Sequence, residues 1–168
     1  MRKVFWFSLV IFACLFNLSY AEDKIAFIDI DRIINESEFG KKSYKKIDED
    51  FNKENKKLLK IEKDLISKEQ EILKQKNVLS EEVLNKKIVD LRKEINDFQK
   101  KRKLTNENFN KKKLDKTNDM VNKLNVILSK YADDNQISLV IQKKFIVIAK
   151  TGLDITSEVM KIFNNEVK

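Results

Sequence analysis

The side chains of this sequence that could do chemistry are almost all carboxylates and lysines. Neighbouring carboxylates, from which acid–base pairs are built, occur at Asp48, Glu49 and Asp50 and at Glu81 and Glu82. A catalytic carboxylate needs burial or a close charge to set its pKa, whereas these stand in a stretch that is charged throughout. We therefore interpret them as solvated helix surface, and we do not expect the chain to be an enzyme.

The residue types that other reaction classes need are scarce. The chain has no histidine, one cysteine, Cys14, and two glycines. Histidine acid–base chemistry is therefore excluded, and thiolate metal sites are excluded if Cys14 is removed with the N-terminal segment described below. Two glycines cannot build a phosphate-cradling loop, which argues against an ATP-driven mechanism. We expect no cofactor and no metal.

Lysines are the other candidate groups, and they are unevenly distributed. Residues 41–130 contain 26 lysines or arginines against 16 acidic residues, whereas 22–40 and 131–168 together contain 7 against 11. A basic extended surface collects anionic or acidic-patched partners. We place a candidate binding surface near the middle of this basic stretch. Its residues are Lys74, Lys76, Lys86, Lys87, Arg92 and Lys93.

Basic runs at 100–103 and 111–113 could also bind nucleic acid through phosphate contacts. Two observations oppose this reading. No aromatic residues are interleaved with the lysines of these runs, and the N-terminus directs the chain out of the cytoplasm.

Residues 1–21 have the features of a secretory signal peptide. A basic start precedes an apolar stretch over 4–16, and small residues near Ala21 suit a signal peptidase. The apolar stretch, about 13 residues, is shorter than the roughly 20 that cross a bilayer, so a retained anchor is the weaker alternative. Lipidation at Cys14 is weaker still. The sequence therefore predicts secretion.

A helical arm is predicted for residues 41–130. From residue 41 to 151 the chain contains no glycine or proline, a run of 111 residues. Apolar residues recur at steps of three and four, as in a coiled coil. The spacing of seven from Tyr44 to Leu79 forms one seam, which weakens toward its far end and predicts a looser tip.

A second seam runs from Leu84 to Tyr131, and its phase slips between Phe109 and Leu114. Ser80 followed by two acids is typical of a helix start, which predicts a reversal near 77–80. The two seams then pair as an antiparallel hairpin. One continuous helical rod is the alternative.

The flanks, 22–40 and 131–168, are predicted to form a β-rich base. Apolar runs at 25–30, 137–142 and 145–149 are rich in β-branched and aromatic residues, as strands are, and the last two are expected to form a hairpin. Asp31 and Thr156 are the expected helix caps, and the first helix should be interrupted near Gly40.

A base of 57 residues is marginal as an independent domain and has no disulfide or metal to stabilise it. Association of several copies is the simplest way to bury its excess apolar surface, so we predict a homo-oligomer. The number of copies does not follow from composition or periodicity. The expected oligomer core comprises Ile25, Phe27, Ile28, Leu139, Ile141, Phe145 and Val147.

Several stretches of the base follow a known pattern. Residues 24–29 lead into Ile-Ile-Asn-Glu-Ser at 33–37, and strands near 138–149 precede Asp-Ile-Thr-x-Glu-Val at 154–159, the most specific element. The sequence resembles the Skp, or OmpH-like, family of periplasmic chaperones over the whole chain after residue 21. Gln142 departs from the aspartate common in that family.

The resemblance implies a trimeric jellyfish architecture, in which strands of three subunits share a barrel and three hairpins enclose a cavity. It also implies ATP-independent holding of unfolded outer-membrane β-barrel proteins in the periplasm. Anionic lipid or lipopolysaccharide is a further partner that a basic surface permits, whereas nucleic acid is not expected.

The sequence thus predicts an α+β protein with a small sheet or barrel base and a long coiled-coil hairpin, acting as a periplasmic holdase chaperone. The first rival is a structural coiled-coil spacer of the cell envelope. The second is a basic nucleic-acid-binding protein, which requires an uncleaved N-terminus.

Overall fold

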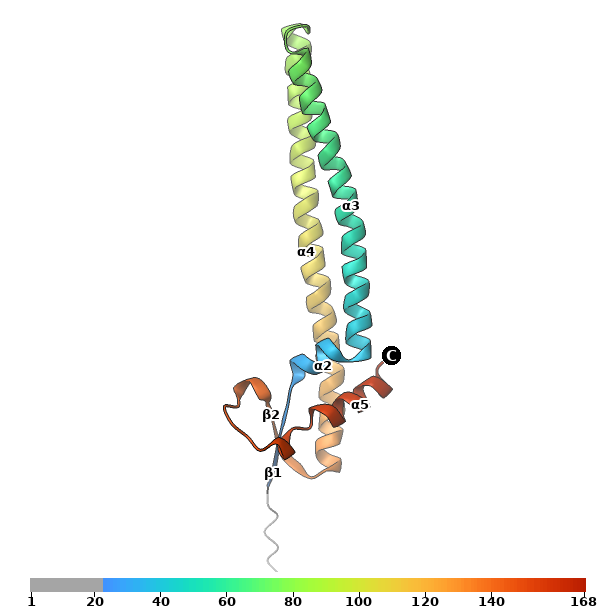
Figure 1. Cartoon of the computed structure of the whole chain (residues 1–168), viewed down its shortest axis with the longest axis vertical. Coiled ribbons are helices and arrows are strands. Elements are labelled where there is room, and N and C mark those ends of the chain that lie inside the picture. The colour runs from blue at the N-terminus through green and yellow to red at the C-terminus, as the bar shows by residue number, and fades with distance from the viewer. Residues whose placement is uncertain (1–22) are drawn as a thin grey trace, which may run out of the picture.

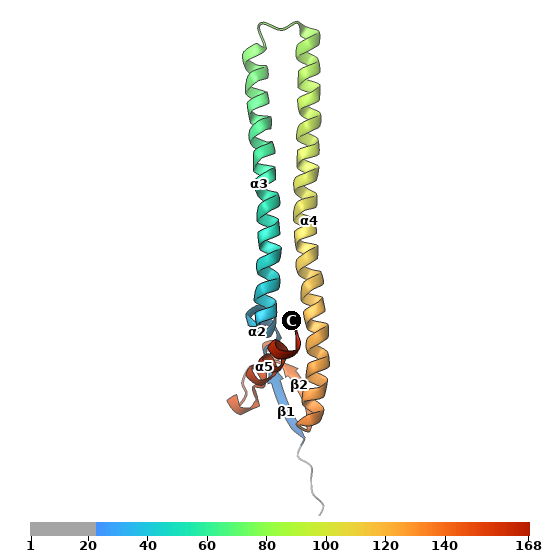
Figure 2. The ribbon, with the colours of Figure 1, turned by 90° about the vertical axis from the view of Figure 1, so that its right-hand side faces the viewer.

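The computed structural model describes residues 23–168, and the proposed signal peptide, 1–21, lies outside them. The chain is mostly helical, with a long helical hairpin standing on a small base that holds both described ends of the chain (Figures 1 and 2). The elements follow in the order β1 (Lys24–Ile28), α2 (Ile30–Glu36), α3 (Glu38–Gln75), α4 (Glu81–Asp134), β2 (Ile137–Gln142), the 3₁₀ turns η1 (Lys143–Phe145) and η2 (Thr151–Leu153), and α5 (Thr156–Glu166).

The hairpin is formed by α3 and α4, of 38 and 54 residues, which run antiparallel and are joined by residues 76–80 (Figure 2). Ser80 is the residue before α4, and Glu81 and Glu82 occupy its first turn, where carboxylates favour the positive end of the helix dipole. The Ser80 side chain makes no capping hydrogen bond, so the acidic first turn is the start signal that the structure retains.

The sheet has two strands, β1 and β2, which pair in parallel. Parallel strands need a long crossover connection, and here the whole helical hairpin supplies it. The backbone N–H of Ile155 donates to the carbonyl oxygen of Phe27 at 3.0 Å, which ties the start of α5 to the other side of β1. The strand expected over 25–30 is shorter, because α2 already begins at Ile30.

The expected hairpin between 137–142 and 145–149 is wrong. After β2 the chain makes the 3₁₀ turn η1, and residues 146–150 belong to no strand. Phe145 is 71% exposed and Val147 102%. Residue composition favours a strand here, but a strand forms only where a neighbouring edge supplies hydrogen bonds, and the part of the chain that the structure describes offers none to this segment.

The turn from α2 to α3 also differs from the prediction. Asp29, not Asp31, caps α2, since its carboxylate accepts from the backbone N–H of Arg32 at 2.9 Å. The break falls at Ser37, whose buried hydroxyl accepts from the N–H of Gly40 at 3.1 Å. Gly40 therefore lies inside the first turn of α3 rather than between two helices.

The start of helix α5 also differs from the prediction by one residue, because Thr156 was expected to precede the helix as its cap. Thr156 is its first residue, and its N–H donates to the carboxylate of Asp154 at 3.0 Å. The Thr156 hydroxyl donates to the same carboxylate and accepts from the backbone N–H of Asp29 at 2.9 Å. Thr156 thus joins two helix starts instead of capping its own helix.

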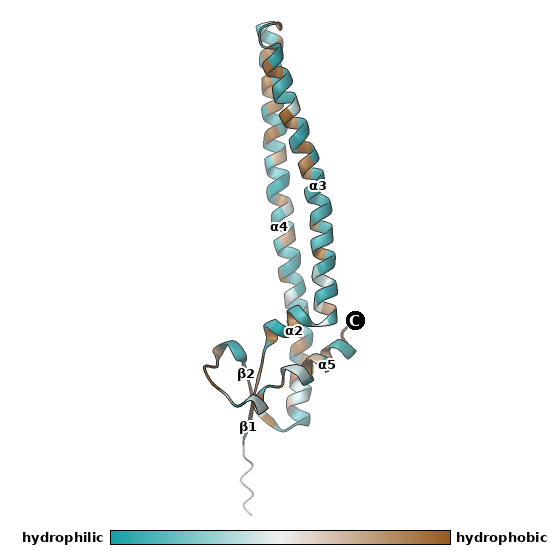
Figure 3. Cartoon of the chain, in the orientation of Figure 1, coloured by the Kyte–Doolittle hydropathy of each residue, from teal (hydrophilic) through white to brown (hydrophobic). Residues whose placement is uncertain are grey.

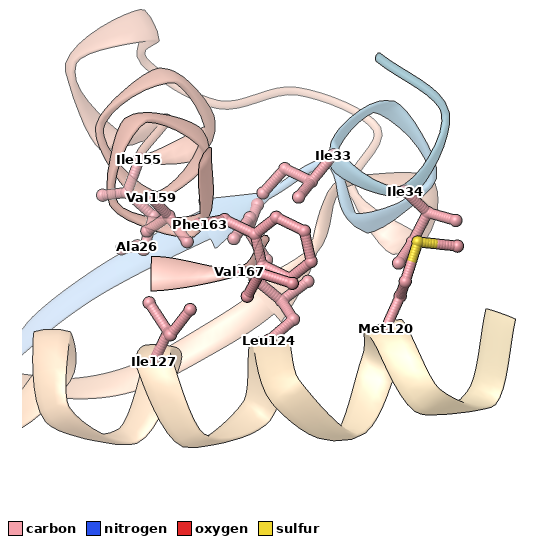
Figure 4. Packing of buried hydrophobic residues seen from close by; sticks show 11 residues of the cluster. Ala26, Ile33, Ile34, Met120, Leu124, Ile127, Ile155, Val159, Phe163 and Val167 are labelled. Atoms are coloured by element: carbon pink, nitrogen blue, oxygen red, sulfur yellow. The ribbon is translucent and has the colours of Figure 1, made fainter. Parts of the chain in front are cut away.

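The base core lies between α5, α2, the strands and the lower part of α4. Phe163 of α5 is fully buried and points toward Leu124 of α4 in the centre of the cluster (Figure 4). Met120 and Ile127 of α4 are buried in the same cluster. The predicted arm extends to residue 130, whereas α4 around Met120 to Ile127 packs as one wall of the base core.

Candidate functional site on the helical arm

The arm is held together by a buried apolar cluster in its distal half. Leu58 and Leu65 of α3 and Phe98 of α4 are each at most 7% exposed, with Ile61 and Leu91 packed beside them. All five belong to the seams expected from the heptad spacing. Burial of these side chains contributes on the order of 1.5–3 kcal/mol each, enough to keep two otherwise solvated helices together.

Polar contacts between the two helices show the register of the hairpin. The Lys68 Nζ lies 2.6 Å from the Glu94 carboxylate, and the Lys87 Nζ donates to the Gln75 side-chain oxygen at 2.7 Å. Nearer the base, the Tyr44 hydroxyl lies 2.6 Å from that of Thr117. The exposed pairs contribute little stability individually, but they show which residues of the two helices face each other.

Between the distal cluster and the base the seam is more open. Phe51 and Phe109 stack with ring centroids 4.0 Å apart, yet both rings are only half-buried, as is Ile47. These rings lie in a cleft of about 850 Å³ between α3 and α4. Looser packing was expected toward the tip, and the structure shows an open seam between the distal cluster and the base.

The basic residues predicted as a binding surface all lie near the tip and are all exposed. Lys74 is in the last turn of α3 and Lys76 follows it, while Lys86 and Lys87 lie in the first turns of α4. The contact from Lys87 to Gln75 brings these two groups to the same height. Arg92 and Lys93 lie further along α4 toward the base.

Exposed apolar side chains on the distal half of the arm are a feature that the sequence pattern did not predict. Leu59, Ile66 and Leu73 of α3 are 55%, 50% and 65% exposed. Each follows a seam residue by one position, so together they form a second stripe at intervals of seven. Figure 3 shows hydrophobic residues of this kind scattered among hydrophilic ones along the arm. A search for a second heptad register would have found the stripe. Val78, Val83 and Val89 add exposed apolar surface at the turn and on α4.

The residues predicted for an oligomer core fall into two groups. Phe27 and Ile28 are at most 7% exposed, and Ile28 belongs to the core of its own chain. Ile141 is half-buried. Ile25 and Leu139 are about half exposed, and Phe145 and Val147 are more exposed still.

Asp119 and Asp154 have lowered pKa values, and both take part in hydrogen bonds that hold the local structure. The pKa of Asp119 is lowered by hydrogen bonds from Lys123 and Lys116, each at 3.1 Å, and both lysines lie over the ring of Phe39. Burial alone would raise the pKa of Asp154, but hydrogen bonds from Thr156 and the charges of Lys143 and Arg32 lower it. Across residues 23–168 no cluster of three potential metal ligands occurs.

Among the described helices, none combines the length and the apolar character of a membrane span. The described residues thus form a long solvated hairpin on a small mixed base. The family model of outer membrane protein (OmpH-like) sequences matches residues 24–163. The chain therefore belongs to the OmpH-like family.

Comparison with solved structures agrees with this assignment. A crystal structure from Caulobacter crescentus, described as a candidate OmpH-like outer-membrane chaperone, superposes with a TM-score of 0.81 at 16% sequence identity. The match covers 88% of this chain and 88% of the other. At this identity the likeness establishes the shared fold. Comparison with curated proteins gives no match.

Proposed function

We propose that this protein is an ATP-independent periplasmic holdase that binds unfolded outer-membrane β-barrel proteins between its helical arms. The observation that carries the proposal is the distal arm surface, where the exposed stripe Leu59, Ile66 and Leu73 stands among exposed lysines. Each of these side chains leaves apolar surface in water, which contact with an apolar segment of a client would cover.

An unfolded client offers apolar side chains and carboxylates at irregular intervals. A stripe of separated apolar groups with mobile lysine side chains can meet many such arrangements, each through a weak contact. Several weak contacts on connected arms add up by raising the effective concentration of the client at the remaining sites. Holding the client in this way lowers the concentration of aggregation-prone chains without any fixed pocket or nucleotide.

The family and the base support a trimer as the working assembly. Residues 145–149 present exposed apolar side chains and have no strand partner among residues 23–168, and Ile25 and Leu139, which pair with each other in the sheet, are half exposed. Pairing with a second copy would satisfy this edge. Three joined bases would place three arms around one cavity. Phe27 and Ile28 would take little part in the contact between copies, because they are already buried within their own subunit.

The assembly is tested by Val147→Lys, measured by mass photometry and sedimentation of protein that starts at residue 22. Val147 is fully exposed within one chain, so the change should leave the helical content intact while shifting trimers to monomers. Val78→Lys, at a position in the arm turn that is also largely exposed (84%), is the matched control and should leave the trimer unchanged. Wild-type protein that stays monomeric at micromolar concentration would contradict the trimer.

The holdase activity is tested by diluting a urea-unfolded outer-membrane β-barrel protein into buffer with and without the purified protein. Suppression of light scattering is expected without nucleotide, and it should weaken as salt rises because the charge contacts are exposed. Absence of suppression at every stoichiometry would favour the structural spacer. Detection of mature protein beginning near Glu22 in a periplasmic extract would dispose of the nucleic-acid binder.

A further inference from the structure

The cleft in the middle of the arm has a composition that a simple packing gap does not need. Its floor is formed by the half-buried Ile47, Phe51 and Phe109, and Thr105 lies at its α4 side. Seam positions further along the arm, such as Leu58 and Phe98, are closed against each other. Here both rings remain half-buried, and the Lys113 Nζ lies 4.8 Å from the centroid of Phe109, over the face that Phe51 does not cover. Among residues 23–168 no such cation lies over the outer face of Phe51, so apolar surface there remains in contact with water.

Lysines surround this aromatic floor in excess over acids. Five lysines and three acids line the cleft. Lys53 and Lys57 are engaged with Asp50 at 3.8 Å and Glu54 at 2.6 Å. The other three lining lysines, Lys56, Lys111 and Lys112, have no ion pair among residues 23–168.

The lysines around the cleft lower the pKa of one of its acidic residues, Glu54. A hydrogen bond from Lys57 lowers the pKa of Glu54, and the charges of Lys101 and Lys112 on α4 lower it further. The lysines of the two helices therefore act on a common space. A carboxylate entering from outside would meet the same field.

We infer that this cleft is a binding site for an aromatic side chain flanked by carboxylates in an extended polypeptide. The inference rests on the proposed function, since such a segment would come from the unfolded client. An aromatic ring would extend the stack at the outer face of Phe51, and the neighbouring carboxylates would meet Lys111, Lys112 and Lys56. A purely apolar lipid chain would leave these lysines unused, and a free anion would leave the rings uncovered.

The probe is a short capped peptide in which one tryptophan stands between aspartate and glutamate in a glycine–serine background. The only tryptophan of the chain is Trp6, so protein starting at residue 22 does not contribute to the fluorescence. Binding should shift the peptide emission to shorter wavelength. Peptides with lysines for the acids, or with alanine for the tryptophan and a terminal dye, should bind at least about tenfold more weakly.

The position is tested by replacing the tryptophan with a photoreactive phenylalanine analogue and mapping the cross-links. They are expected on residues 47–57 of α3 and 105–115 of α4. Thr105→Phe fills the cleft from its own wall and should abolish the cross-link, whereas Asn106→Phe adds the same ring one position away, outside the lining, and should not. Circular dichroism melting of both variants checks that the arm remains folded.

The charge requirement is tested by the double change Lys111→Glu and Lys112→Glu. It should weaken peptide binding by about tenfold or more, because both lysines lie at the cleft. The control, Lys100→Glu with Lys103→Glu, alters the net charge equally but outside the lining. The Debye length in physiological buffer is about 8 Å, so salt screens the effect of charges outside the cleft on a bound peptide. We therefore expect the affinity for the peptide to change by no more than about twofold in this control.

The outcomes separate this inference from the proposed function. A protein that suppresses client aggregation but cross-links the peptide elsewhere, or binds the lysine peptide equally well, overturns the cleft inference and leaves the holdase proposal standing. Cross-linking in the cleft together with no suppression of aggregation removes the holdase proposal and supports the site alone. Equal loss of binding in both charge-reversal variants overturns the cleft, since it shows attraction by net charge only.

Discussion

Gly40→Ala should destabilise the protein although it places a better helix former inside a helix. Alanine is favoured over glycine in a helix interior by about 0.5–1 kcal/mol, so propensity alone predicts a stabilised arm. Gly40 occupies the first turn of α3, where α2 ends against it. A Cβ at this position would lie 1.9 Å from the backbone carbonyl oxygen of Ile34 and 2.9 Å from the Ser37 hydroxyl.

The size of the effect follows from that distance. Ordinary contact begins near 3.4 Å, so the end of α2 would have to move by about 1.5 Å relative to α3. Ile33 and Ile34 on α2 are buried in the base core, and the movement would disturb their packing. Overpacking of this kind costs about 1–3 kcal/mol, or more where backbone must shift, so we expect a net loss of about 2 kcal/mol.

Gly152→Ala is the matched control, because Gly152 is the only other glycine and a Cβ there meets nothing within 4 Å. This variant should be neutral or more stable by up to about 1 kcal/mol, since alanine restricts the unfolded chain. Urea unfolding followed by circular dichroism at one protein concentration measures both. A Gly40→Ala protein as stable as the wild type would refute the steric reasoning.

Three further changes test the base and the arm. Phe163→Ala removes the fully buried ring at the centre of the base core and should lower the free energy of unfolding by about 3–5 kcal/mol in urea titrations. The lowered pKa of Asp154 means that its contribution to stability is present above the pKa of the unfolded state, about 4, and is lost as the pH falls through the lower folded value. Asp154→Asn should therefore be less stable than the wild type near neutral pH, and the difference should narrow in acid unfolding curves below about pH 4. On the part of α4 near the tip, Lys86→Glu with Lys93→Glu should raise the amount of protein needed to suppress client aggregation, while the same change in net charge at Lys130 and Lys161 should not.

The hairpin was predictable because its signals are local. Heptad spacing identifies which residues of a helix face a partner, and the partner here is the next helix along the chain. Leu58, Leu65 and Phe98, read from spacing alone, are the buried cluster of the arm. The exposed stripe next to the α3 seam was not predicted, because the seam explains only one heptad register. The stripe belongs to a second register that begins one residue later.

The base was less predictable because its contacts join distant residues. Composition marks 145–149 as strand-like, but it does not say whether an edge is available, and β2 instead pairs in parallel with β1 across the whole arm. The helix caps shifted for a similar reason. Thr156 has the right chemistry for a cap, yet its hydroxyl is used by the backbone of Asp29, which lies 127 residues away in sequence.

The choice of lysine over arginine in the arm bears on how it would bind. Of the 26 basic residues between 41 and 130, only Arg92 and Arg102 are arginines. Arginine presents a rigid fork that selects bidentate geometry, whereas lysine is a point charge on a flexible stem that accepts carboxylates from many directions. A surface meant to recognise one folded partner would gain from the fork. An arm meant to hold many unfolded chains gains from lysine, because each contact is weak, tolerant of geometry and quickly exchanged, and selectivity is left to the few places, such as the stacked Phe51 and Phe109, where an aromatic surface stands among the charges.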